Sequence, residues 1–272
     1  SLMWISRGTR LDVIYTVGML ARVTHNPGVV HWEAALKVLS YLKSTRDIRL
    51  TFNAHTDSDR ITASVDADFL PNYGDEFNNW KSTSGYHVYL GGAAVSWMSK
   101  RQDVIATSTA HAETLAAYDC VREILKLRGL KSDLGFPDHG PTVIQEDNQT
   151  VVREVLNAGS SSAIKHWCSK IHWIRQCVDE KRVSFAWVKS ADQMSDCATK
   201  PLPKPAFIEQ RDHSLGMAHK TFDIDVNIYR ENAHKFPSDG LSLVHTTTET
   251  LAGPNAGMHT VAWWQHVCRQ AV

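Results

Sequence analysis

Hydrophobic residues in this chain change their period from place to place, and the order of these changes restricts the fold more than any other feature. Residues 58–69 alternate with the two-residue period of a β-strand. Residues 85–99 contain YHVYL and AAVSWMS on either side of Gly91-Gly92, a pattern typical of a β-hairpin. Three consecutive strands are therefore expected in this part of the chain.

A helical period follows over residues 109–128. Ser108 or Thr109 is a suitable N-cap, and Gly129 is expected to end the helix. The remaining expected elements are the strand TVIQE, the helix NQTVVREVLNA, a helix over about 165–180, the strand RVSFAWVKS and a short helix from Asp192. This order predicts an α/β fold with a mixed five-stranded sheet and helices on both faces.

Helical stretches also precede the predicted sheet. DVIYTVGMLARV and HWEAALKVLSYLKST are amphipathic and flank the helix-breaking Asn26-Pro27-Gly28. We expect residues 1–57 to form a small helical segment and residues 58–217 to form the sheet-containing domain. Residues 218–272 show no clear period and form a tail to which the sequence assigns no fold.

Four acidic residues come from separate predicted elements. Asp66 lies in the first strand, Glu113 in the long helix and Asp147 directly after TVIQE, while Asp196 lies in ADQMSDCATK. Any one of them alone is best explained as an ordinary surface residue. Together they form the set that a two-metal nuclease needs. Mg²⁺ prefers oxygen ligands, and two ions about 4 Å apart can activate a water and neutralise charge on a phosphodiester.

The segments around these acids resemble the ribonuclease H domain of copia-type LTR retrotransposon polyproteins. The similar segments are KSTSGYHVYLGGAAVSWMSKRQDVIATSTAHAET, EDNQTVV, KHWCSKIHWIRQCV, VKSADQMSDCATKPL and FIEQRDHSLGM. The upstream run TRLDVIYTVGMLARVTHNPGVVHWEAALKVLSYLKSTRDIRLTF resembles the C-terminal end of the reverse transcriptase in the same polyproteins. The resemblance extends from about residue 7 to about residue 217, with several motifs in the family's order and spacing.

This resemblance implies a ribonuclease H-like fold and Mg²⁺-dependent endonucleolytic cleavage of the RNA strand of RNA–DNA hybrids, with Mn²⁺ able to substitute. The catalytic residues and ligands of two Mg²⁺ ions that it implies are Asp66, Glu113, Asp147 and Asp196. Asp66 is the first acid of the family's DAD motif and would be the central ligand, whereas Asp68 is expected to be structural. The implied partners are an RNA–DNA hybrid and the rest of a reverse transcriptase.

The chain departs from the family and from its relatives at three points. His111 stands where the family usually has Glu, but it lies on a different helix face from Glu113, so the loss is expected to be tolerated. No Asp-Asp pair is present, so no reverse transcriptase activity is expected from this chain. No His occurs between His172 and His213, so the mobile-loop His of many cellular ribonucleases H has no counterpart.

Side chains near the acids are candidates for contacts with the hybrid. Phosphate contacts are expected from the charge and hydroxyl groups of Lys81, Ser82, Thr83 and Ser84. A basic helix could grip the backbone through Lys165, Lys170 and Arg175, although a solvated helix face explains these residues equally well. Asn148 and Gln149 could reach the sugar edge, where a 2′-OH distinguishes RNA from DNA, but Asn148 fits a helix N-cap equally well.

Composition restricts partners and compartment. Lys plus Arg equals Asp plus Glu at 29 each, which argues against strong stand-alone binding to nucleic acid while allowing a local basic face. Five cysteines without a CxxC pair fit a reducing compartment, so we expect an intracellular protein of the cytoplasm or nucleus, not a secreted one. No apolar run approaches the ~20 residues of a membrane span, so no membrane partner is expected.

Two other functions remain open at this point. The chain could be a decayed retroelement remnant that only binds nucleic acid or protein. The missing polymerase core, the neutral charge and His111 favour this hypothesis, whereas the four intact acids favour activity. Related chemistry on the same fold, such as that of a DNA nuclease or an integrase-like enzyme, is disfavoured by the sequences that flank the acids.

Overall fold

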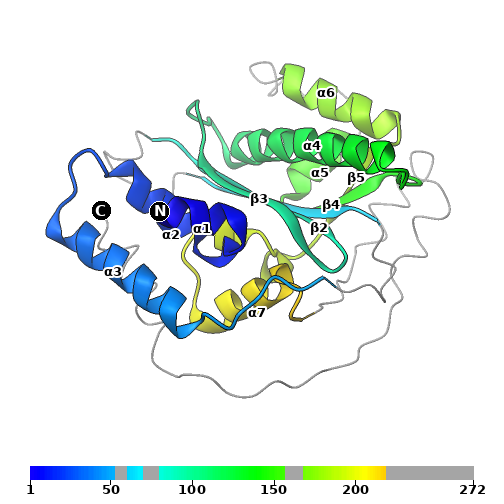
Figure 1. Cartoon of the computed structure of the whole chain (residues 1–272). Helices are drawn as coiled ribbons and strands as arrows, with labels where there is room; N and C mark the ends of the chain where they lie inside the picture. The colour runs from blue at the N-terminus through cyan, green and yellow to red at the C-terminus, as the bar shows by residue number, and fades with distance from the viewer. Residues whose placement is uncertain (53–59, 70–79, 157–167, 219–272) are drawn as a thin grey trace.

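A mixed five-stranded sheet lies at the centre of the computed structural model, which describes residues 1–52, 60–69, 80–156 and 168–218 (Figure 1). The strands are β1 (Thr62–Asp68), β2 (Thr83–Leu90), β3 (Ala93–Arg101), β4 (Thr142–Glu146) and β5 (Val183–Trp187). Their order in the sheet is β3-β2-β1-β4-β5. β2 is antiparallel to both β1 and β3, whereas β4 runs parallel to both β1 and β5. The predicted mixed sheet is confirmed.

The hairpin between β2 and β3 turns at the two glycines that the sequence indicated. Gly91 and Gly92 have φ angles of 65° and 77°. Only glycine adopts these angles without a steric cost, and two consecutive positive φ values suit the right-handed twist of the flanking strands. The hairpin places β3 at one edge of the sheet, separated from β1 by β2.

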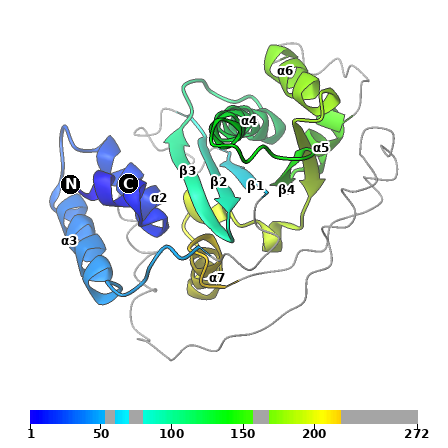
Figure 2. The same cartoon turned by 45° about the vertical axis from the view of Figure 1, so that its right-hand side comes forward.

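Three helices cover one face of the sheet: α4 (Thr109–Asp133), α5 (Gln149–Leu156) and α6 (Cys168–Asp179) (Figures 1 and 2). The main hydrophobic core lies between these helices and the sheet. Its fully buried side chains include Val65, Val88, Val121, Ile124, Ile144, Ile174 and Phe185. The core fixes the position of α4 across the strands, and α4 carries one of the four acids.

The start of α4 agrees with the prediction, but its end does not. The Ser108 hydroxyl accepts a hydrogen bond from the His111 N–H at 3.1 Å, so Ser108 is the N-cap. The predicted stop at Gly129 is wrong, because α4 continues to Asp133. The turn that stops the helix after Asp133 has Gly135 in the left-handed conformation (φ 88°), and the Phe136 N–H donates to the Lys131 carbonyl in a Schellman motif. One glycine inside a helix costs only about 1 kcal/mol, which is too little to stop it.

The remaining elements lie outside this layer of three helices, and α7 is on the opposite side of the sheet from α4 (Figures 1 and 2). They are α1 (Leu2–Gly8), η1 (Leu11–Val13), α2 (Ile14–Arg22), α3 (Val29–Ser44), η3 (Ser190–Asp192), η4 (Asp196–Ala198) and α7 (Lys204–Ser214). Helices on both faces are thereby confirmed. The expected short helix from Asp192 is wrong in detail: η3 ends at that residue, and the fourth acid begins the separate 3-10 turn η4.

The N-terminal helices share a core with the C-terminal elements. A second cluster of buried side chains joins them through Val13, Val17, Val38, Tyr41, Cys197, Leu202 and Phe207. Beside it, Arg10 pairs with Asp12 at 2.7 Å, and the Tyr41 hydroxyl donates to Asp12 at 2.8 Å. The helical segment is therefore packed against η4 and α7 and is an integral part of the structure.

The expected boundary at residues 57 and 58 and the tail from residue 219 lie outside the described residues. Among the helices that the structure describes, none is long and apolar enough to cross a membrane.

Candidate active site

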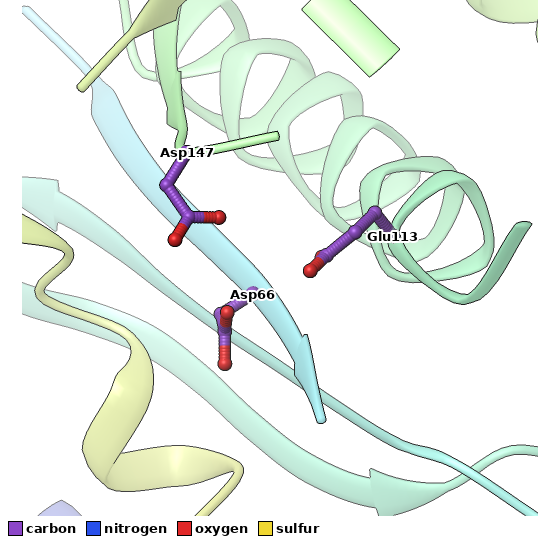
Figure 3. Close-up of side chains that lie close together, drawn as sticks. All are labelled: Asp66, Glu113 and Asp147. Carbon is purple, nitrogen blue, oxygen red and sulfur yellow. The ribbon is translucent and has the colours of Figure 1, made fainter. Parts of the chain in front are cut away.

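Three carboxylates meet at one end of the sheet. Asp66 lies near the C-terminal end of β1, Asp147 directly follows β4, and Glu113 lies near the N-terminal end of α4. Because β1 and β4 are parallel neighbours, their C-terminal ends meet at the same edge of the sheet. One carboxylate oxygen from each of the three residues lies within 4.8 Å of the others. Figure 3 shows the three side chains approaching one another from separate elements.

The fourth predicted acid, Asp196, lies next to this group but outside it. Asp196 is buried in η4, and its Oδ1 lies 2.8 Å from Nζ of Lys200. The same ammonium lies 3.8 Å from Oδ2 of Asp66. The site therefore has two sides that share Asp66: three acids on one side, and Asp196 with a lysine on the other.

A glycine permits η4 to lie directly against β1 and β2. Gly85 is paired with Asp66 in the register of β1 and β2. A Cβ atom at Gly85 would lie 2.7 Å from Cγ2 of Thr199 and 2.8 Å from Cβ of Ala198, closer than real Cβ contacts. Because this space is free, the Thr199 hydroxyl reaches Asp66 and donates a hydrogen bond to its Oδ2.

Two residues outside the predicted site hold the backbone of the site. The Gln193 amide donates to the Val65 carbonyl at 2.8 Å, which ties the segment before η4 to β1. The Trp187 indole N–H donates to the Asp147 carbonyl at 2.8 Å. No sequence pattern distinguishes Gln193, because an isolated amide in a loop is ordinary.

Glu146 is a further acid that the sequence analysis missed. It is fully buried, and its Oε1 accepts a hydrogen bond from the Asn148 N–H at 3.0 Å. Its other oxygen is buried without a hydrogen-bond partner in the described part of the chain. Strand alternation could have found it, because Glu146 shares the face of β4 that buries Ile144.

The electrostatics of the site favour a bound cation. Burial, followed by the charges of Glu146 and Asp66, raises the pKa of Glu113 well above its usual range. Burial also raises the pKa of Asp66, while the charge of Lys200 opposes this shift. Burial and the charge of Asp66 raise the pKa of Asp196 to about 7. These carboxylates are costly to ionise together unless positive charge is supplied.

Asp68 and His111 lie beside the site and outside the group of three acids. Asp68 is partly buried at the end of β1, and burial raises its pKa to about 6. The His111 ring accepts a hydrogen bond from the Thr107 N–H through Nδ1 at 3.2 Å, within the turn that leads into α4. The structural role of Asp68 and the tolerated loss of the family's Glu at His111 both stay predictions.

The structure buries three of the hydroxyl groups that were predicted to contact phosphate. Ser82, Thr83 and Ser84 are at most 2% exposed. Arg22 donates to the Thr83 hydroxyl at 3.3 Å, and the Gln102 amide donates to the Ser84 hydroxyl at 2.9 Å. Lys81 remains partly exposed, with Nζ donating to the Asp103 carbonyl at 2.6 Å.

The three basic residues that were predicted to contact the hybrid backbone from a helix have different surroundings. Nζ of Lys170 lies 4.9 Å from the centre of the Tyr118 ring. Arg175 is largely buried and pairs with Glu154 at 3.1 Å, so its charge joins α6 to α5. Lys165 lies outside the described residues.

The two amides after Asp147 have different surroundings. Asn148 accepts hydrogen bonds from the N–H groups of Thr150 and Val151 at 3.0 and 3.3 Å through its Oδ1 atom, as an N-cap of α5 does. Gln149 is exposed at the start of α5. Of the two, Gln149 is the one whose side chain is open to a ligand.

A mixed sheet in the order β3-β2-β1-β4-β5, with helices on both faces and carboxylates on β1, α4 and the end of β4, defines a ribonuclease H-like domain. No protein-family model matches the chain. It is 33% identical over 208 residues to the Retrovirus-related Pol polyprotein from transposon TNT 1-94 of Nicotiana tabacum, covering 76% of this chain and 15% of that protein. It is 34% identical over 199 residues to the Retrovirus-related Pol polyprotein from transposon RE2 of Arabidopsis thaliana, covering 73% of this chain and 13% of that protein.

The chain belongs to the ribonuclease H region of copia-type retrotransposon polyproteins. It spans roughly one seventh of the length of these relatives. Among solved structures, it is similar to the N-terminal RNase H domain of a Mycobacterium tuberculosis protein. That similarity has a TM-score of 0.38 and 12% identity, and covers 56% of this chain and 95% of the other.

Proposed function

We propose that this chain hydrolyses the RNA strand of RNA–DNA hybrids, as the ribonuclease H part of a copia-type polyprotein. The observation that carries the proposal is the convergence of Asp66, Glu113 and Asp147 within 4.8 Å in a chain of this family. Hydrolysis of a phosphodiester requires a positively charged centre that faces the phosphate, and three carboxylates on separate rigid elements can hold one.

The donor set fits a hard divalent cation. All three side chains offer carboxylate oxygens, which Mg²⁺ and Mn²⁺ prefer over nitrogen or sulfur. Oε2 of Glu113 is buried without a hydrogen-bond partner in the described residues, so it is free to act as a ligand. A bound ion would polarise the phosphate and generate a nucleophilic water near neutral pH. A second ion, with Asp66 and Asp196 as its protein ligands, belongs to the same proposal.

The surrounding residues keep the ligands in place. Thr199 donates a hydrogen bond to Oδ2 of Asp66 and so restrains this carboxylate. Trp187 fixes the main chain at Asp147 through its carbonyl. Such rigid support matters because catalytic groups must be held within about 0.5 Å of the productive geometry.

For the hybrid itself, we propose contacts from Lys81, Lys170 and Gln149. Lys81 precedes β2 near the end of β1, where Asp68 is paired with Thr83. A few such contacts are compatible with the zero net charge, because the positive charge is local. In the polyprotein, the reverse transcriptase would deliver the hybrid, and we place this activity inside the cell.

The test is cleavage of an end-labelled RNA–DNA hybrid by the purified chain with Mg²⁺, with single-stranded RNA and duplex DNA as other substrates. Asp147→Asn should abolish cleavage, since it removes one ligand charge. Asp179→Asn is the matched control, because Asp179 is exposed at the end of α6 and should keep full activity.

Cleavage of the hybrid alone, lost only in Asp147→Asn, would support the proposal. A folded protein that binds the hybrid without cleaving it would favour the alternative of a decayed remnant that acts as a binding module.

A further inference from the structure

Lys200 lies where the charges of Asp66 and Asp196 meet. Its Nζ is 2.8 Å from Oδ1 of Asp196 and 3.8 Å from Oδ2 of Asp66. The group of three potential metal ligands on the other side of Asp66 does not include Asp196. An ammonium ion thus occupies the side of the site that a second metal ion would require.

The backbone around Lys200 is held firmly, whereas its side chain can leave. The Lys200 N–H donates to the Asp196 carbonyl at 2.9 Å, and the Thr199 hydroxyl also reaches that carbonyl at 3.1 Å. The Lys200 side chain is 35% exposed, compared with 3% for Asp66 and 11% for Asp196. The ammonium can therefore move to solvent by rotating its own side chain, without moving either acid.

We propose that Lys200 is the resident counter-ion of the Asp66–Asp196 side and limits the free protein to one divalent ion, held by Asp66, Glu113 and Asp147. A second ion then binds only when the phosphate of a hybrid supplies further oxygen ligands and Lys200 moves out. This inference rests on the proposed function, because it concerns the same metal site.

The physical reason is competition between cations for one pair of carboxylates. Lys carries a compact charge on a flexible stem, so it neutralises the two acids at no cost in protein rearrangement. Mg²⁺ and Mn²⁺ must give up water to bind there, and two carboxylates alone offer few ligands. Removing the ammonium leaves two neighbouring carboxylates without a counter-ion, which strongly favours a divalent cation.

The test is the number of Mn²⁺ ions bound by the full chain without nucleic acid, measured by isothermal titration calorimetry and by electron paramagnetic resonance of free Mn²⁺. The wild type should bind one ion, and Lys200→Met should bind two. Lys200→Arg keeps the charge and should bind one. Lys126→Met is the matched control and should also bind one, because Lys126 is 70% exposed and about 20 Å along α4 from Glu113.

Lys200→Gln provides a second neutral variant, which can still hydrogen-bond to Asp196 if the Met variant does not fold. Two ions in the wild type, or one in both neutral variants, would overturn the inference while leaving the proposed function intact. No Mn²⁺ bound to any of these proteins would overturn both the proposed metal site and this inference.

Discussion

Replacement of Gly85 by alanine tests how η4 is seated against the acids. The added Cβ would lie 2.7 Å from Thr199 and 2.8 Å from Ala198, and also 3.3 Å from the Ala198 carbonyl carbon. The last contact is with the main chain, so the strain cannot be relieved by a side-chain rotation alone. Forcing one extra carbon into a packed site costs roughly 1–3 kcal/mol. For a domain of this size, that corresponds to a fall in melting temperature of about 2–12 °C.

The matched control is Gly129→Ala in the middle of α4. A Cβ at Gly129 meets no atom within 4 Å, and the residue has ordinary helical geometry. Alanine is favoured over glycine inside a helix by roughly 0.5–1 kcal/mol, so this variant should be more stable than the wild type. The same chemical change is thus expected to have opposite signs at the two positions, as measured by urea unfolding and thermal melting in EDTA.

Hybrid cleavage should also differ between the two variants, with a lower rate in Gly85→Ala than in Gly129→Ala. Displacement of η4 moves Thr199 and Lys200 away from Asp66, and a misplacement of about 1 Å near a reacting centre can cost roughly 100-fold in rate. Hybrid cleavage should be assayed at a temperature where both variants are fully folded. A Gly85→Ala protein as stable and as active as Gly129→Ala would refute the argument that free space at Gly85 seats η4.

Three other outcomes follow from the site and the core. Mg²⁺ at 100 times its dissociation constant should stabilise the fold by about 2.7 kcal/mol, and the thermal shift should be much smaller in Asp147→Asn. The folded protein retains the Asp196 proton from about pH 3.8 to about pH 7, where the unfolded chain loses it. In EDTA, the wild type should therefore lose stability relative to Asp196→Asn as the pH rises through this window, and a change in the opposite direction would contradict the assigned pKa. Asp12→Ala should cost roughly 3–5 kcal/mol in urea unfolding, because it leaves the buried charge of Arg10 unpaired, whereas a loss below 1 kcal/mol would show that water reaches this pair.

The order of strands and helices along the chain was predictable because it is determined by local hydrophobic periodicity and by turn residues. The alternation at β1, the glycine pair between β2 and β3, and the Ser108 cap are all local signals that the tertiary structure keeps. The end of α4 was not predictable from Gly129, because a weak local preference gives way to a helix that continues to a better stop at Gly135.

The surroundings of the site depend on contacts between distant segments. The sequence predicted accessible hydroxyl groups at Ser82, Thr83 and Ser84. In the structure, however, β2 is covered by α4 on one side and by η4 and α2 on the other. The i,i+4 spacing of Asp196 and Lys200 allows an ion pair, yet only the fold shows that this pair lies beside Asp66. Residue types near the acids were therefore predictable, while their exposure and pairing were not.

The cluster that joins the N-terminal helices to Cys197, Leu202 and Phe207 also has a consequence for the time course of folding. During synthesis, Val13 and Val38 emerge before all five strands, but their core partners Cys197, Leu202 and Phe207 follow more than 150 residues later. Contacts between such distant segments close slowly, because the chain loses much entropy in joining them. The face of the first helices that packs against these three residues therefore gains them as partners only after the strands have been made, and until then its apolar side chains can be bound by chaperones or aggregate.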